Sequence, residues 1–447
     1  MKRQCQQNKH GLAVHEEQAA YGRRFQFLEF FAGGGMARAG LARNWESVWA
    51  NDFSEDKALV YQCNWGVKEM HVGDVANVQL ASLPDADMAW GSFPCQDLSL
   101  AGDQSGIGSR HDDDEARTRS GTFWPFWRLV SQKHPPLVVL ENVVGALTSN
   151  NGADLRAITE ALCADGYRFG ALVMDAQAWV PQSRPRLFIV CVSVKATLPK
   201  GIFSYTPDPR WHTDAVINAF RNLSPKTQSA WLWWMMPPPK RRVPAAETLI
   251  EKTSDKWIDW DSPEKTQYLI SLMNATHRER LAQAQAMGRR IVGFGYRRTR
   301  EGAQRLEVRF DGIAGCLRTA CGGSSKQIVI EVNGPSVRTR LLSPREAARL
   351  QGLPDTYWLP DSYNDAYDAV GDGLCVPVVA HLGETLLTPL AEHIQRNPIK
   401  NNYTYEEPID TASFQLCETA GVQTKRRPVR GAGDYRPRPR RTTAQSR

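Results

Sequence analysis

The chain has 447 residues, which is enough for one large domain or two smaller ones. Apolar residues make up 42% of it and charged residues 23%, as in an ordinary globular protein. No apolar run approaches the roughly 20 residues of a membrane helix, and the polar start lacks the apolar centre of a signal peptide. We therefore expect a cytoplasmic protein that does not enter a membrane. The closest cysteine pair, Cys316 and Cys321, has no second pair nearby, so we expect no metal site.

The net charge of +7 resides in the C-terminal segment. Residues 425–447 hold nine Lys or Arg and one acid, whereas the rest of the chain holds 46 basic and 47 acidic residues. We expect residues 396–447 to form a basic, Pro- and Arg-rich, disordered tail, because such a composition cannot build a packed core. This tail is either a nonspecific phosphate-binding arm or a solvated segment with no role. At the other end, residues 1–24 form a polar extension.

A regular pattern begins at Phe25. The run FQFLEFFAGGGMARAGLARNW predicts a buried strand, a glycine loop and a helix, and SVWAND predicts a second strand that ends at Asp52, seventeen residues after Gly35. In a doubly wound sheet, such a turn lets a ligand approach the backbone, and such an acid receives ribose hydroxyls. A tight strand-to-helix turn is the alternative, but the paired acid favours a nucleoside cofactor. Two further strands, MHVGDV and DMAWGSFPC, end at Asp74 and Cys95 at the same sheet edge.

Cys95 is a candidate nucleophile at that edge. A thiolate needs neighbours that lower its pKa or take its proton, and a lone cysteine is otherwise a small buried hydrophobe. The strand PPLVVLENVVG carries Glu141 to the same edge, either as a catalytic group or as a solvated acid. In VPQSRPRLFIVCV, the residues Gln182, Arg184 and Arg186 alternate and should project to one face. Arginine forks there suit carboxylates, phosphates or base edges, and a surface strand with alternating bases is the alternative.

Several blocks occur in a fixed order along the chain. They read FAGGG, FPCQDLSLAG, ENVVG, PQSRPR, RLLSPREAARLQGLPD and GDGLCVPVV. Together they resemble the cytosine-C5 DNA methyltransferases of bacterial or phage type, over residues 29–194 and again over 337–390. The resemblance implies an α/β fold with a doubly wound mixed sheet, Rossmann-like and dependent on S-adenosylmethionine, into which a smaller DNA target-recognition domain is inserted.

The same resemblance implies the domain organisation. The catalytic and cofactor-binding core would span residues 25–195, the target-recognition domain 196–336, and the return to the core 337–395. In the returning segment, Ser343 should cap a helix that begins at Pro344.

By this resemblance the protein is a DNA (cytosine-5-)-methyltransferase that acts on a short specific duplex sequence. Cytosine C5 is a poor nucleophile, and addition of the Cys95 thiolate to C6 would make C5 electron-rich enough to accept a methyl group. Glu141 would hold N3 of the ring, and Arg184 and Arg186 would position the base. Because the ring is stacked inside the duplex, it must be flipped out.

The resemblance also implies a binding site for S-adenosylmethionine. Its expected residues are Phe31, Gly33, Gly35, Asp52, Phe53, Asp74, Pro94, Asp372 and Leu374. Phe53 would stack on adenine, and Asp74 would accept a hydrogen bond from the adenine amino group. Two positions depart from the family, since Met36 replaces a further glycine and Asp372 replaces an asparagine. Asp372 is either a neutral exchange at a turn or a carboxylate that attracts the sulfonium.

Residues 196–336 lose the strand–helix alternation and gain tryptophans and basic strands such as GFGYRRTR. Aromatic and basic residues in short strands suit groove and phosphate contacts, although tryptophans more often pack in a core. The expected DNA contacts are Gln96, Ser99, Gln182, Arg297, Arg298, Arg300, Arg318 and Lys326. This interval is therefore the part of the chain that we expect to read DNA.

Two alternatives stand beside this interpretation. A tRNA cytosine-C5 methyltransferase is disfavoured by the length of the interval 196–336. A catalytically silent DNA-binding homologue is disfavoured by the intact set of Cys95, Glu141 and Arg186. We expect a monomer that acts on double-stranded DNA, either alone or beside a cognate restriction endonuclease.

Overall fold

The computed structural model of the chain describes residues 24–94, 120–239, 243–250, 256–300, 302–319 and 326–398. All of them belong to one compact unit, Met1–Thr404. Cys95, Gln96 and Ser99 lie outside the described residues, as do residues 399–447 of the expected tail. The roles predicted for these residues therefore rest on the sequence.

Seven strands form the large sheet, in the order β3-β2-β1-β4-β5-β7-β6. Their bounds are β1 Phe25–Phe30, β2 Trp45–Asp52, β3 Met70–Val72, β4 Met88–Gly91, β5 Leu137–Val143, β6 Tyr167–Asp175 and β7 Pro185–Ser193. Neighbouring strands are parallel except that β7 runs antiparallel to both β5 and β6. The central strands β4 (MAWG) and β5 (LVVLENV) are largely apolar, as expected where helices cover both faces of the sheet. The predicted doubly wound mixed α/β fold is confirmed.

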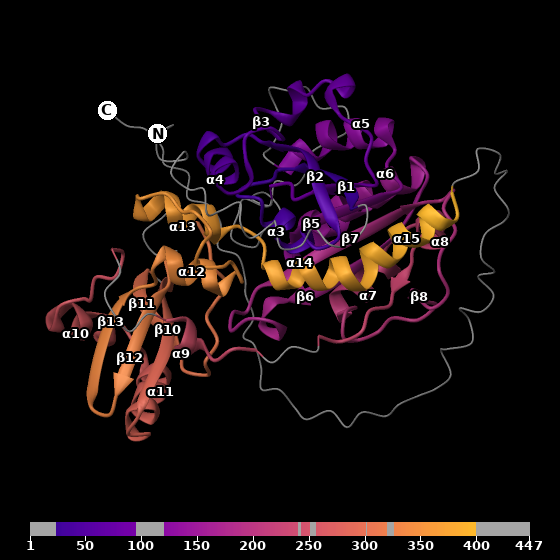
Figure 1. Ribbon diagram of the computed structural model, residues 1–447. Helices are drawn as coiled ribbons and strands as arrows, with labels where there is room; N and C mark the ends of the chain where they lie inside the picture. The colour runs from indigo at the N-terminus through magenta and orange to yellow at the C-terminus, as the bar shows by residue number, and fades with distance from the viewer. Residues whose placement is uncertain are drawn as a thin grey trace, which may run out of the picture. The chain divides into compact units, whose positions relative to one another are not determined.

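Helices from both ends of the chain cover this sheet (Figure 1). One face packs against α3 (Met36–Leu41), α14 (Val376–Leu382) and α15 (Thr388–Arg396), and the other against α5 (Phe123–Lys133) and α6 (Ala153–Ala164). The helix α4 (Glu55–Trp65) connects β2 to the edge strand β3. Because α14 contacts α3, the end of the described chain closes onto its first strand–loop–helix unit.

The segment after β7 also packs on the large sheet. It contains β8 (Phe203–Ser204), α7 (Asp214–Arg221), α8 (Pro225–Ser229) and β9 (Trp233–Trp234). Trp234 is fully buried and donates a hydrogen bond from Nε1 to Val190 O at 3.1 Å, and Trp231 is buried as well. These tryptophans are core residues, as their type predicts, but the core is that of the large sheet. The boundary expected at residue 196 therefore falls inside the large core, because the apolar residues that follow cover β6 and β7.

A second, smaller sheet follows in the order β11-β10-β12-β13, with all neighbours antiparallel (Figure 1). Its strands are β10 Arg290–Arg300, β11 Ala303–Arg309, β12 Ile328–Asn333 and β13 Ser336–Leu341, and its helices are α9 Ala246–Leu249, α10 Pro263–Ser271 and α11 Ala275–Ala286. It has an apolar core of its own, which includes Leu269, Leu281, Leu306, Ile330 and Val332.

A buried ion pair fixes the return from the small sheet to the large core. Arg340 Nη2 of β13 lies 2.6 Å from Glu346 Oε1 of α12 (Pro344–Leu350), and both side chains are fully buried. The Ser343 hydroxyl accepts a hydrogen bond from the Glu346 N–H, while Glu346 Oε2 accepts one from the Ser343 N–H. The predicted cap at Ser343 and the helix start at Pro344 are confirmed.

The last helices form one long apolar stretch, Tyr363–Arg396, which begins with α13 (Tyr363–Gly371). By length and composition alone it could cross a membrane, but 61% of its most apolar window is buried inside the protein. Its apolar residues pack in the large core, among them Val370, Val379 and Leu390.

Candidate active site

The glycine loop between β1 and α3 has an open side and a packed side. Gly33 and Gly35 have φ angles of 55° and 80°, in the left-handed region that favours glycine. A side chain at Gly35 would collide with Trp65, whereas a Cβ at Gly33 would meet no atom within 4 Å. The Trp65 Nε1–H and the Tyr357 hydroxyl both donate to Gly34 O, at 3.0 and 2.7 Å. The backbone at Gly33 is therefore held in place and remains open to a ligand.

Asp52 is tied to this loop at the end of β2. Its Oδ2 accepts a hydrogen bond from the Gly33 N–H at 2.8 Å, and its Oδ1 accepts one from the Ser54 N–H at 2.9 Å. Burial raises the pKa of Asp52, while Lys57 opposes this shift. Phe53 is 75% exposed, so its ring is free of protein contacts on much of its surface. This arrangement suits a nucleoside, with hydroxyls at Asp52 and a base on Phe53.

The other predicted cofactor residues lie near the same edge of the large sheet, and their contacts differ. Phe31 has a positive φ of 57° and packs on Phe126, with ring centroids 5.9 Å apart. Asp74 accepts a hydrogen bond from the Ala76 N–H at 2.9 Å and caps a short turn of 3₁₀ helix. Pro94 ends a described segment, directly before Cys95, and Leu374 is buried in the large core.

The two departures from the family pattern lie beside the same turn. A side chain at Gly373 would collide with Met36 Sδ, so Met36 fills the space against a glycine of the returning segment. Asp372, which precedes Gly373, forms an ion pair with Lys57 of α4, with 2.6 Å between Nζ and Oδ2. Both departures therefore have partners within the protein.

Glu141 and Arg186 form the centre of the predicted catalytic set. They come from the antiparallel strands β5 and β7, and Arg186 Nε lies 3.3 Å from Glu141 Oε1. Glu141 is buried, and this burial raises the pKa of its carboxyl group against the opposing effects of Arg186 and of a hydrogen bond with Ser92. A carboxyl with a raised pKa beside an arginine can present a proton to a ring nitrogen.

Two neighbours of this set were not singled out in the sequence. The Asn142 amide donates from Nδ2 to Phe93 O at 3.2 Å, and so holds the backbone two residues before Cys95. Ser92 accepts a hydrogen bond from Trp90 Nε1 at 3.0 Å, besides its contact with Glu141. The ENVVG block contained the signal for Asn142, because a buried amide beside a strand-end acid needs a partner.

Arg184 and Gln182 are both buried, and their side chains are bonded to backbone groups of other segments. Arg184 is buried and donates to Leu317 O at 2.8 Å and to Gly373 O at 2.7 Å, so its side chain joins three segments of the protein. Gln182 is fully buried, and its amide bonds to Leu350 O and to the Leu317 N–H. The assignment of Gln182 to DNA contact is corrected, since the protein interior surrounds its side chain and uses its amide.

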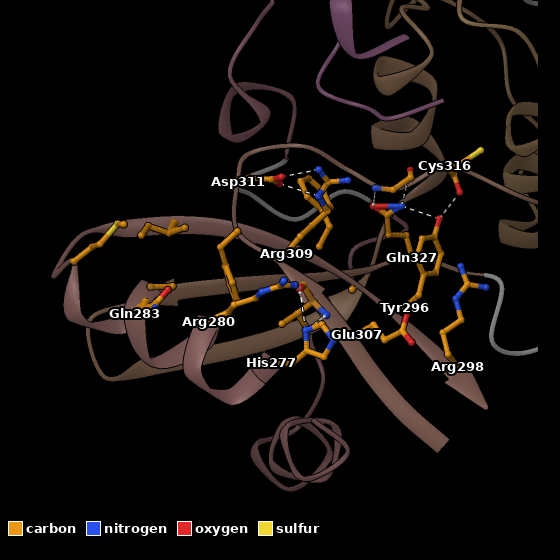
Figure 2. Close-up of a pocket in the computed structure, with 18 of the residues that line it drawn as sticks. His277, Arg280, Gln283, Tyr296, Arg298, Glu307, Arg309, Asp311, Cys316 and Gln327 are labelled. Carbon is orange, nitrogen blue, oxygen red and sulfur yellow. Dashed lines mark hydrogen bonds and ion pairs between the residues drawn. The ribbon is translucent and has the colours of Figure 1, made fainter. Parts of the chain in front are cut away.

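The predicted DNA contacts of the small sheet differ in their partners. Arg300 pairs with Glu307 at 2.9 Å, and Lys326 Nζ donates to Asn364 Oδ1 at 2.6 Å. Arg298 lies over the Tyr296 ring at 4.8 Å. Arg297 also lies on β10 and is half-buried. Among the described residues, no ion pair joins Arg298 or Arg318 to a carboxylate, and both line a groove of about 770 Å³ between α11 and the sheet (Figure 2).

The chain is similar to known proteins over most of its length. A family model described as C-5 cytosine-specific DNA methylase matches residues 25–388. The type II methyltransferase M.NlaX of Neisseria lactamica is 27% identical over 372 residues, which cover 82% of this chain and 97% of that protein. The type II methyltransferase M.HhaI of Haemophilus parahaemolyticus is 26% identical, over 80% of this chain and 92% of its own length.

Solved structures show a similar fold. The Dnmt2 methyltransferase of S. pombe matches with a TM-score of 0.51 and 16% identity, over 84% of this chain and all of that chain. A DNMT2 mutant from Spodoptera frugiperda matches with a TM-score of 0.55 and 15% identity, over 82% and 99% of the two chains.

Proposed function

The chain belongs to the C-5 cytosine-specific DNA methylase family, and we propose that it transfers a methyl group from S-adenosylmethionine to C5 of a cytosine flipped out of duplex DNA. The observation that carries this proposal is the Glu141–Arg186 pair. It lies at the carboxyl end of β5, next to β4, which leads into Cys95.

In this proposal Cys95 is the nucleophile that adds to C6 of the cytosine. Negative charge then develops in the ring, and a protonated Glu141 relieves it by donating to N3. After methyl transfer a base removes the C5 proton, and the Cys95 thiolate is eliminated from C6, which restores the aromatic ring and the free enzyme. The raised pKa of Glu141 supports this role, because burial favours the neutral acid that the donation requires. Arg186 would orient the carboxyl group, and Asn142 would hold the backbone that presents Cys95. Arg184 contributes indirectly, by fixing the segments around it.

The glycine loop and its neighbours fit S-adenosylmethionine. The open backbone at Gly33, the strand-end carboxylate of Asp52 and the exposed ring of Phe53 are suited to its methionine, ribose and adenine parts. When bound, this compound supplies an electrophilic methyl group on a sulfonium. We assign Gly35 to shaping the turn, and Phe31, Asp74, Pro94, Asp372 and Leu374 to the surrounding wall.

We assign recognition of the target sequence to the small sheet. Arg298 and Arg318 are its best candidates, since no ion pair with a described carboxylate occupies them. Guanidinium groups bind guanine edges or phosphates with two parallel hydrogen bonds. Arg297, Arg300 and Lys326 are further candidates for contacts with the DNA backbone.

Methylation of a plasmid in a host that lacks cytosine methyltransferases tests this function. Bisulfite sequencing should find 5-methylcytosine at one cytosine of a short recurring sequence, and none in cells that carry an empty vector. A wild-type protein that leaves every cytosine unmodified, yet is folded and binds S-adenosylmethionine, would refute the proposal.

A further inference from the structure

Residues 314–318, which we call the strap, join the large core to the small sheet. On the core side, the Ala314 N–H donates to Pro181 O at 2.7 Å, and Ala314 O accepts from the Ser183 N–H at 2.9 Å. At the other end of the strap, a side chain at Gly371 would collide with Arg318 O. The strap therefore runs from the loop before β7 to the turn that carries Asp372.

Two residues just before β7, Gln182 and Arg184, bind the strap through their side chains. Arg184 donates from Nη1 to Leu317 O at 2.8 Å and to Cys316 Sγ at 3.4 Å. Gln182 Oε1 accepts a hydrogen bond from the Leu317 N–H at 3.2 Å. Since Arg184 also donates to Gly373 O, a shift of the strap must move Arg184 or break its bonds.

The small sheet holds the strap from its other side, through Tyr296 of β10 (Figure 2). The Tyr296 hydroxyl donates to Cys316 O at 2.6 Å and accepts from Gln327 Nε2 at 2.8 Å. The Gln327 side chain also bonds both backbone groups of Gly315, at 3.1 and 3.0 Å. A Cβ at Gly315 would lie 2.7 Å from the Tyr296 ring, so glycine is required for this close approach.

The same tyrosine supports a candidate DNA contact. The Arg298 guanidinium lies over the Tyr296 ring, 4.8 Å from its centroid, and Arg318 is the last residue of the strap. Burial raises the pKa of Tyr296 to about 12, so its hydroxyl keeps the proton that it donates to Cys316 O. Both Arg298 and Arg318 line the groove, and burial and the nearby Arg318 lower the pKa of Arg298.

We propose that Tyr296 is a positioning residue that couples DNA contact at Arg298 and Arg318 to the placement of Arg184, by way of the strap. The inference rests on the proposed function and deepens it. An anion or guanine edge bound between the two arginines relieves their repulsion and fixes Arg298 on the Tyr296 ring. The hydrogen bond from Tyr296 then fixes Cys316, and the contact of Cys316 with Arg184 fixes the Arg184 side chain. Reaction rates depend on ångström-scale placement of such groups, whereas DNA affinity depends mainly on the arginines themselves.

The test removes the Tyr296 hydroxyl, with its hydrogen bonds to Cys316 O and from Gln327 Nε2, and keeps the ring. Tyr296→Phe leaves the stacking surface for Arg298 but loses the donor to Cys316 O. We expect the single-turnover rate of methyl transfer to fall about 5-fold or more, which is the effect of losing the hydrogen bond to Cys316 O alone or together with the one from Gln327. The dissociation constants of the variant for target DNA and for S-adenosylmethionine should each differ from those of wild type by less than about 2-fold. Tyr167→Phe is the matched control, because the Tyr167 hydroxyl donates to Pro135 O at 2.9 Å. Pro135 lies just before β5, at the end of that strand far from the strap. The transfer rate of this variant should equal that of wild type.

A second readout does not require turnover. Burial works against the thiolate of Cys316, but Arg184 and Arg186 outweigh it and lower the pKa of this half-buried thiol, which should therefore react with iodoacetamide. Target duplex should slow alkylation of Cys316 in wild type and in Tyr167→Phe, and have less effect in Tyr296→Phe, as followed by peptide mass spectrometry.

The outcomes separate the two proposals. A Tyr296→Phe variant with an unchanged transfer rate, or with a rate loss matched by its loss of DNA affinity, overturns the coupling while the methyltransferase function stands. A wild-type protein that binds DNA but transfers no methyl group refutes the function. The coupling is then decided by Cys316 protection, which must differ between wild type and Tyr296→Phe for the coupling to stand.

Discussion

Lys57 Nζ lies 2.6 Å from Asp372 Oδ2, so an ammonium group from α4 compensates the carboxylate that replaces the family asparagine. Burial disfavours the charge on Lys57, yet Asp372 and Asp52 together raise its pKa. Both side chains are partly exposed, at 32% and 44%, and such pairs contribute about 1 kcal/mol or less. If S-adenosylmethionine binds as we propose, Asp372 would act on its sulfonium as one half of a pair with Lys57.

Two variants should shift cofactor selectivity in opposite directions. Asp372→Asn removes the carboxylate that pairs with Lys57, which disfavours the sulfonium of S-adenosylmethionine, whereas Lys57→Met removes the ammonium that pairs with Asp372 and favours it. S-adenosylhomocysteine lacks the sulfonium charge and serves as the reference ligand. We expect the ratio of the two affinities to change about 2- to 5-fold in each direction, as measured by calorimetric titration. Equal ratios in all three proteins would make Asp372 a turn residue only.

Cys95→Ser should abolish methyl transfer and leave binding of S-adenosylmethionine intact, because the Cys95 side chain is not among the predicted cofactor contacts. A duplex with 5-fluorocytosine at the target should trap wild-type protein covalently, since fluorine at C5 cannot leave as a proton. The adduct is read on a denaturing gel. Cys163→Ser, at a half-buried thiol on α6, is the control and should still be trapped. Wild-type protein that binds this duplex without forming an adduct would exclude the thiolate mechanism.

Deprotonation of Glu141 should make the rate of methyl transfer fall at high pH. Burial raises the pKa of its carboxyl group above the ordinary value of 4.5, so the acid keeps its proton to a higher pH. The rate should fall as pH rises through this raised pKa, because the donor to N3 is then lost. Glu141→Gln should be slower throughout, by about 10²-fold or more, and should not show this fall. Single-turnover rates between pH 5 and pH 9 decide this point, and an identical pH profile in both proteins would remove Glu141 from the proton-donor role.

The sequence predicts those parts of the fold and site that local patterns determine. Apolar strands, the glycine turn and acids at strand ends follow from residue types and spacing, and the large sheet and the positions of Asp52 and Glu141 agree with them. Alternation showed that Gln182 and Arg184 share a direction, but it did not reveal that residues 314–318 cover them.

Contacts between distant segments account for what the sequence could not predict. The Lys57–Asp372 pair spans 315 positions of the chain, and no local pattern relates two such residues. Trp231 and Trp234 were expected in a core, but only the assembled structure shows that this core belongs to β6 and β7. The residue type thus predicted that these tryptophans are buried, but the fold determines that they are buried against the large sheet.

Glu29 should make the protein less stable as pH rises. It lies in β1 at 1% exposure, where Oε1 accepts a hydrogen bond from the Arg38 N–H at 3.3 Å and Oε2 has no hydrogen-bond partner among the described residues. Burial raises its pKa from 4.5 to about 8, although Arg38 opposes this shift. The folded state then binds a proton that the unfolded state has released, so stability present below pH 4.5 is lost as pH rises towards 8.

Urea unfolding of wild type and Glu29→Gln from pH 5 to pH 8.5 measures this loss. The free energy of unfolding of wild type should fall relative to the variant by about 4 kcal/mol across this range. Glu331→Gln is a control of opposite sign: burial of Glu331 is outweighed by hydrogen bonds from Arg290 and Arg338, which lower its pKa. The stability that Glu331 contributes is present at neutral pH and is lost as pH falls. The free energies of unfolding of wild type and Glu331→Gln should therefore become equal only at acid pH. Parallel pH curves for wild type and Glu29→Gln would mean that Glu29 is ionised in the folded protein, with Arg38 compensating its charge.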